Sequence, residues 1–126
     1  MRPTKDEYYL NIAEAVMQRS TCLRRKYGAV IVKNDEIIAT GYNGPPRGEK
    51  HCNICSKQNS KDYENQCHSV HAEMNAIISA SRRNMIGATL YLASDKPNAE
   101  PCDICRRLII NAGIKKVITK HGKLFP

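Results

Sequence analysis

The chain has 126 residues, of which 41% are hydrophobic and 25% are charged. This length suits one core, and the composition is ordinary for a globular protein, so residues 1–126 are expected to form a single domain. No stretch is long and apolar enough to span a bilayer, and the charged N-terminus lacks the apolar core of a signal peptide. These features predict a cytoplasmic protein with no membrane partner.

Charge and cysteine content narrow the function further. The formal net charge of +8 favours an anionic partner, such as a nucleotide phosphate, a nucleic acid or an acidic surface. The alternative is a protein that is basic without any such role. The chain has six cysteines, which in a reducing compartment indicate metal binding or catalysis more than disulfides.

The first half of the chain predicts a helix followed by a hairpin. Thr4 and Glu7 have the spacing of a capping box, and apolar residues then recur at helical intervals over residues 5–20. Apolar, β-branched runs at 27–32 and 37–42 flank a polar turn and predict two strands. Residues 43–69 are rich in Gly, Pro, Asn, Lys and Cys and predict a long loop that needs an anchor to be ordered.

The second half predicts helices alternating with strands. A helix is expected from residue 71 to about 83, strands at 88–93 and 114–119, and a helix over Cys102–Ala112. Pro101 and Gly113 are typical of the start and the end of that last helix. The order αββαβαβ predicts an α/β protein with a mixed sheet and crossover helices, layered α/β/α.

Two short motifs carry candidate chemistry: His71-Ala72-Glu73, and Pro-Cys-Asp-Ile-Cys at residues 101–105. Each opens a predicted helix, where free N–H groups and positive potential stabilise thiolates and developing negative charge. One imidazole and two thiolates form a three-ligand zinc site with a fourth position free for water. We therefore predict that His71, Cys102 and Cys105 bind a catalytic zinc and that Glu73 shuttles protons. A structural zinc with Glu73 as a bystander is the alternative.

The pattern H-x-E…P-C-x-x-C is the signature of zinc nucleobase deaminases, and this chain resembles the deoxycytidylate (dCMP) deaminase family in particular. The resemblance implies a cytidine-deaminase-like fold and hydrolysis of dCMP to dUMP and ammonia, a step of pyrimidine deoxynucleotide metabolism. It assigns zinc to His71, Cys102 and Cys105, and the proton shuttle to Glu73. The matching stretches span most of the chain: Arg19-Ser20-x-Cys22-x-Arg24, Tyr27–Val32, Gly41–Pro45, His71–Ile77, Pro101-Cys102-x-x-Cys105 and Ile109–Val117.

The resemblance also implies positions for the substrate. It places Asn43 against the sugar and the backbone N–H of Ala72 near the pyrimidine carbonyl, although Asn43 also suits a plain turn. The phosphate needs cationic partners, and Arg24 and Arg25 are candidates, with Lys96 a further one. Ordinary surface charge is the alternative for each of them. Family members are often oligomers regulated by dCTP and dTTP, so the resemblance implies a homo-oligomer and makes these nucleotides candidate effectors, although nothing in the spacing of residues shows such regulation.

The remaining cysteines suggest a second metal. Cys52-x-x-Cys55 has a zinc-knuckle spacing inside the long loop, and a closed site there would pin the loop to the first helix. The candidate ligands are Cys22, Cys52, Cys55 and Cys67, with His51 or His68 as alternates. Some dCMP deaminases carry such a second zinc. Free buried thiols and disulfides are the alternatives.

Two rival functions share some of these features. Transfer-RNA adenosine deaminases also contain His-Ala-Glu-Met and would suit the basic charge, but the Gly-Tyr-Asn-Gly-Pro loop favours the dCMP family. A non-catalytic, zinc-stabilised nucleic-acid-binding module would have no use for Glu73. With no Trp and one Phe, the chain also lacks the aromatic residues of a single-strand binding surface, so a nucleic-acid partner is not expected. The polar segment Ala93–Glu100 is longer than expected for the family and could shift the preference toward dCTP or a modified cytosine.

Overall fold

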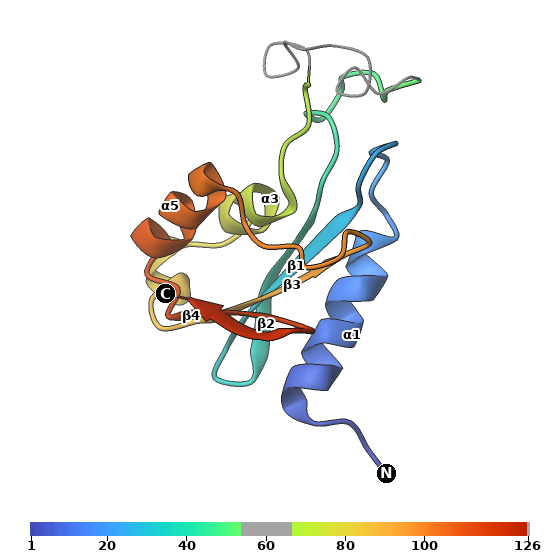
Figure 1. Cartoon of the computed structure of the whole chain (residues 1–126). Helices are drawn as coiled ribbons and strands as arrows, with labels where there is room; N and C mark the ends of the chain where they lie inside the picture. The colour runs from blue at the N-terminus through green and yellow to red at the C-terminus, as the bar shows by residue number, and fades with distance from the viewer. Residues whose placement is uncertain (54–66, 126) are drawn as a thin grey trace.

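A mixed sheet separates two helical layers in the computed structural model, which describes residues 1–53 and 67–125 (Figure 1). Among these residues, no helix combines the length and the apolar character needed to cross a membrane. The elements in chain order are α1 (Lys5–Met17), β1 (Tyr27–Lys33), β2 (Glu36–Tyr42), α3 (Ala72–Ile78), α4 (Arg82–Met85), β3 (Thr89–Ser94), α5 (Asp103–Ala112), β4 (Lys116–Thr119) and β5 (Gly122–Phe125).

The five strands lie in the order β2-β1-β3-β4-β5. β1 pairs antiparallel with both β2 and β3, β3 pairs parallel with β4, and β4 pairs antiparallel with β5. The parallel pair needs a long crossover, which α5 provides. This arrangement confirms the predicted mixed α/β sheet.

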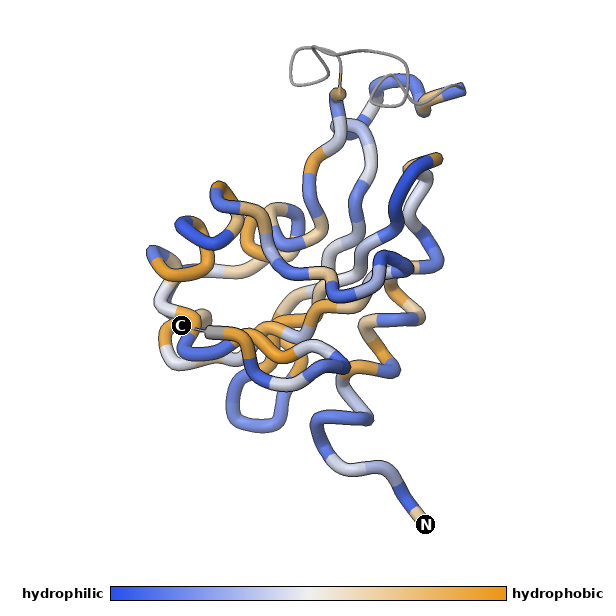
Figure 2. Tube along the Cα trace, in the orientation of Figure 1, coloured by the Kyte–Doolittle hydropathy of each residue, from blue (hydrophilic) through white to orange (hydrophobic). Residues whose placement is uncertain are grey.

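Side chains alternate between the two faces of the sheet and form two apolar clusters. Figure 2 shows hydrophobic stretches on the central strands and hydrophilic stretches at the N-terminus and the β1–β2 turn. Because successive strand residues point to opposite faces, one strand supplies both clusters. One cluster packs under α1, and the other packs under α3, α4 and α5, which confirms the three-layer arrangement. The strand residues under α1 are Val30, Val32, Tyr91, Ala93 and Ile118, and those on the other face are Ala29, Ile31, Ala39, Leu90, Leu92 and Val117.

Several boundaries differ from the sequence-based expectations. The expected helix from 71 to 83 is two helices, because the Ser81 side chain accepts a hydrogen bond from the Asn84 N–H and starts α4 anew. Helix α1 ends at Met17 instead of continuing to residue 20. Strand β4 begins at Lys116, not at 114.

The fifth strand was not predicted from the sequence. Its four residues hold too short an apolar run for the alternating pattern to show. The chain reaches β5 through a turn in which Gly122 has a φ of 110°, a conformation that favours glycine. The expected element order αββαβαβ therefore lacks one edge strand.

The chain on either side of residues 54–66 is held together at its base. Gly44 and Val70 exchange two backbone hydrogen bonds of 3.2 and 2.7 Å, and Figure 1 shows the two stretches running side by side. Val70 directly precedes the first residue of the His71-Ala72-Glu73 motif. The start of α3 is thereby tied to the end of β2.

Gly41 lets α3 lie directly on the backbone of β2. A Cβ atom at this position would lie 2.4 Å from the Ala72 carbonyl oxygen and 2.4 Å from the Ala76 nitrogen, well inside van der Waals contact. Only glycine permits this approach. The absence of a side chain at Gly41 therefore determines how closely α3 packs on β2. It thereby also determines where the motif at the N-terminus of α3 lies.

Candidate active site

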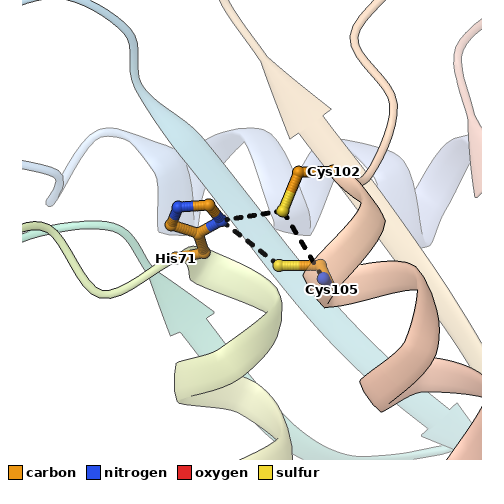
Figure 3. A group of neighbouring side chains, drawn as sticks. All are labelled: His71, Cys102 and Cys105. Atoms are coloured by element: carbon orange, nitrogen blue, oxygen red, sulfur yellow. Dashed lines mark hydrogen bonds between the residues drawn. The ribbon is translucent and has the colours of Figure 1, made fainter. Parts of the chain in front are cut away.

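Two helix N-termini converge on one point above the sheet. His71 is the N-cap residue of α3, and Cys102 is the N-cap residue of α5, with Cys105 one turn further on. His71 Nδ1 lies 3.2 Å from Cys105 Sγ and 3.4 Å from Cys102 Sγ, and the three side chains point toward one another (Figure 3). Crossover topology thus brings together residues that are more than 30 positions apart in the chain.

This donor set fits a zinc ion. The three donor atoms lie within 4.8 Å of one another, and no other group of three such ligands occurs among residues 1–53 and 67–125. Tetrahedral zinc with bonds of about 2.0 Å to nitrogen and 2.3 Å to sulfur sets N···S separations of roughly 3.6 Å, close to those observed. Burial raises the pKa of the Cys105 thiol well above its ordinary value, and the neighbouring Glu73 and Cys102 raise it further. A divalent cation relieves that cost by stabilising the thiolate.

Glu73 lies in the first turn of α3 and is only 3% exposed. Burial raises the pKa of its carboxyl group, while hydrogen bonds from its own backbone N–H and from the Cys105 thiol partly oppose that rise. A buried carboxyl group with a raised pKa, next to a metal-ligand cluster, is suited to take up a proton and pass it on.

The cluster opens into a cavity of about 570 Å³, the size of a small-ligand site. Most of the predicted site residues line it: Cys22, Arg24, Arg25, Asn43, Cys52, Cys67, His71, Glu73, Lys96 and Cys102. Cys105 is buried behind it, and Ala72 is buried at the first position of α3, where a helix leaves its N–H groups without an intrahelical acceptor. Cys55 lies outside the described residues.

Asn43 is held tightly at the end of β2. Its side chain is 5% exposed and accepts hydrogen bonds from the Ser20 hydroxyl at 2.6 Å and the Tyr27 N–H at 2.8 Å. It donates to the Arg25 carbonyl at 2.8 Å. Ser20 and Tyr27 lie in stretches that resemble the family, but sequence reasoning gave neither a role at the site, because their contacts with Asn43 join segments that are distant in the chain.

The segment Ala93–Glu100 also reaches the cavity, through Lys96 and Glu100. It is fastened to the start of β1 by Asp95, whose carboxylate accepts a hydrogen bond from the Lys26 N–H at 3.0 Å. The Ser94 hydroxyl donates to the Lys26 carbonyl at 2.8 Å. The structure therefore places this segment at the border of the site, as expected.

The candidate ligands of a second metal lie along the same cavity without forming a cluster. Cys22, Cys52 and Cys67 line it, yet the described residues hold no second group of three ligand atoms at metal-binding distance. His51 shares a hydrogen bond of 2.9 Å with the Thr21 hydroxyl, which brings the neighbouring Cys52 close to the end of α1. His68 is exposed.

Comparisons with known proteins agree with this geometry. Residues 3–121 match the family model described as the cytidine and deoxycytidylate deaminase zinc-binding region. The chain is 44% identical to a deoxycytidylate deaminase of Mycobacterium phage D29, over 93% of this chain and 94% of that protein. It is 37% identical to a deoxycytidylate deaminase of Schizosaccharomyces pombe, over 93% of this chain but only 37% of that longer relative. Among solved structures, the dCMP deaminase of cyanophage S-TIM5 in complex with dCMP and dUMP matches with a TM-score of 0.73 and 32% identity, covering 94% of this chain and 82% of that one.

Proposed function

Because this chain belongs to the cytidine and deoxycytidylate deaminase zinc-binding family, we propose that it hydrolyses dCMP to dUMP and ammonia. The observation that carries the proposal is the convergence of His71, Cys102 and Cys105 beside the buried Glu73 in one cavity. Relatives named deoxycytidylate deaminases, and a related structure titled as a complex with dCMP and dUMP, support the choice of substrate.

In this mechanism His71, Cys102 and Cys105 would hold the zinc ion. Zinc in such a site supplies a water molecule whose pKa is lowered toward neutrality. With that water in place, the carboxylate of Glu73 would take one of its protons and carry it to N3 of the cytosine ring while the water oxygen bonds to C4. Glu73 would then take the second proton from that oxygen and deliver it to the amine, so that the C4–N bond breaks, ammonia leaves and the C4 carbonyl of dUMP remains. The burial of Glu73 favours the protonated form between these transfers, so the side chain can both accept and donate a proton.

The rest of the cavity positions the nucleotide. The backbone N–H of Ala72, at the start of α3, donates a hydrogen bond to the carbonyl oxygen of the base, and Asn43 contacts the sugar. Arg24 and Arg25 line the cavity and supply positive charge for the phosphate, with Lys96 on the segment that is hydrogen-bonded to Lys26. Two acidic residues, Glu100 and Asp103, also line it, so the positive charge is concentrated on the 24–25 side.

A substrate panel tests the proposal. Ammonia release is measured for dCMP, dCTP, CMP, deoxycytidine and a tRNA anticodon stem-loop, with the zinc content determined on the same sample. Turnover of dCMP with a higher kcat/KM than any other substrate supports it. A folded, zinc-loaded protein that deaminates none of the panel contradicts it, and turnover of the stem-loop alone assigns the site to nucleic acid.

We also propose a second, structural zinc held by Cys22, Cys52, Cys55 and Cys67, with His51 or His68 as a substitute for one thiolate. The positions of Cys22, Cys52 and Cys67 along one cavity, and the contact between Thr21 and His51, support it. Elemental analysis of the wild type and of Cys52→Ser provides the test. Two zinc ions per chain falling to one, with dCMP turnover retained, is the expected result, and one zinc in both proteins contradicts it.

We further propose that the protein is a homo-oligomer that packs through its α3–α5 layer. The exposed fractions of Ile78 (75%) and Ile104 (54%) support it, because apolar side chains that large favour contact with a partner. Light scattering coupled to size exclusion gives the oligomeric state, and a monomer at micromolar concentration contradicts the proposal. Adding dCTP or dTTP to the dCMP assay tests the expected regulation. The cytoplasmic location stays a prediction.

A further inference from the structure

The hydrogen bonds around Asn43 fix which way its carboxamide faces. Oδ1 accepts from the Tyr27 N–H, and Nδ2 donates to the Arg25 carbonyl. If the amide were turned over, a donor would face the N–H and an acceptor would face the carbonyl, so both bonds would be lost at a buried position. Backbone chemistry therefore permits only one orientation.

Ser20 extends this arrangement to the other end of the same segment. Its side chain, 6% exposed, donates to Asn43 Oδ1 at 2.6 Å and accepts from the Cys22 N–H at 3.2 Å. The Ser20 N–H in turn bonds the Met17 carbonyl at the end of α1 at 3.0 Å. The two buried side chains thus form hydrogen bonds with the backbone at Cys22, Arg25 and Tyr27.

The backbone held by these hydrogen bonds forms one wall of the substrate cavity. Residues 21–25 all line it, and Arg24 and Arg25 are its positively charged part. These residues belong to no helix or strand, so they are ordered by side-chain hydrogen bonds. The bonds to Ser20 and Asn43 act together with the Thr21–His51 bond and with those of Lys26 to Ser94 and Asp95. A wall ordered in advance binds a nucleotide at a lower entropic cost than a mobile one.

We propose that Ser20 is a positioning residue of the substrate site: together with Asn43 it clamps residues 21–26 in the conformation that receives the nucleotide. Both acceptor directions of Asn43 Oδ1 are occupied and one N–H of Nδ2 is used, so the hydrogen-bonding group that this side chain has left for a substrate is one N–H donor. The group of the substrate that meets Asn43 is then an oxygen acceptor. This inference rests on the proposed function for its substrate, but the clamp itself is a property of the free protein.

The test compares wild type with Ser20→Ala, with Ser20→Thr as the conservative rescue and Ser79→Ala as the control, an exposed serine at the C-terminal end of α3. For Ser20→Ala we expect the KM for dCMP to rise about three- to tenfold, with kcat within about twofold and unchanged zinc content. Ser20→Thr keeps the hydroxyl and should remain close to the wild-type KM. Ser20→Cys keeps the volume and replaces the alanine variant should that variant fail to fold.

Amide hydrogen exchange of Cys22 and Tyr27 separates this proposal from the proposed function. Loss of the Ser20 hydroxyl should speed exchange at both N–H groups while the strands keep their protection, whether or not dCMP is a substrate. The proposal is overturned if Ser20→Ala keeps both the wild-type KM and the wild-type exchange. It is also overturned if kcat, zinc content and Tm fall together, because that result marks a general structural role.

Discussion

The close contact at Gly41 offers a test of how far the placement of α3 controls the chemistry. In Gly41→Ala the new Cβ would lie 2.4 Å from two backbone atoms of α3, where ordinary contact begins at 3.4 Å. Because both neighbours are backbone, neither can rotate away, and α3 has to move by about 1 Å from β2. That shift displaces His71 and Glu73 relative to Cys102 and Cys105, which belong to α5 and do not contact Gly41. A misplacement of about 1 Å costs roughly 100-fold in rate, and overpacking costs about 1–3 kcal/mol of stability.

The assay is kcat for dCMP, measured well below the Tm of each variant so that the folded fraction is the same. Gly122→Ala is the matched control, because Gly122 has a φ of 110° in the turn into β5 and a Cβ atom there would meet nothing within 4 Å. Strain at that position destabilises the protein by about 1 kcal/mol without moving α3. Equal losses of kcat in the two variants, or a Gly41→Ala variant with wild-type kcat, would refute the reasoning.

Three further outcomes follow from the site and from α1. Glu73→Gln should lower kcat for dCMP by about 10³-fold or more, because it removes the proton-carrying group. Zinc content should stay constant and Tm should not fall, since a buried carboxyl group is replaced by a neutral amide of the same size. A loss of less than tenfold would show that Glu73 is a bystander. Removing zinc with a chelator should abolish activity and lower the Tm, and adding zinc back should restore both; full activity of a metal-free sample, checked by elemental analysis, contradicts the site. Lys5 and Tyr9 hold the pKa of Asp35 below its ordinary value of 3.8, so the stabilisation they give is present above that pH and is lost as the pH falls through the lower, folded-state pKa. Thermal melts of Asp35→Asn should therefore depend less on pH in this acidic range than those of the wild type, and identical profiles would exclude the interaction.

Local signals in the sequence were enough to predict most of the fold. The capping box of Thr4 and Glu7 and the left-handed Gly113 at the end of α5 are both present in the structure. Each depends on residues a few positions apart, so a sequence pattern can reveal it. The zinc-ligand cluster was predictable for a related reason. Cys102 and Cys105 lie on one turn, and a strand-to-helix crossover carries them to the same edge of the sheet as His71.

What the sequence did not reveal depends on contacts between distant segments. Asn43 was expected at the substrate, but its contact with Ser20 was not, because the two residues are 23 positions apart and a serine at position 20 also suits an ordinary turn. The role of Gly41 could not be foreseen either, since a glycine in a strand has several explanations and only the packed helix shows which one applies. The break between α3 and α4 follows from the Ser81 cap, which competes with a helical pattern that continues on both sides.

The paired backbone bonds between Gly44 and Val70 also bear on how such a protein can change over evolutionary time. They close the chain at the base of residues 45–69, so the positions of Asn43 and His71 do not depend on how many residues lie between. By the statistics of chain closure, doubling or halving the length of a connection changes its closure free energy by only about 0.6 kcal/mol. A change in the number of residues between Gly44 and Val70 would therefore alter the closure cost little, and relatives can differ in length there while Asn43 and His71 keep their relative placement.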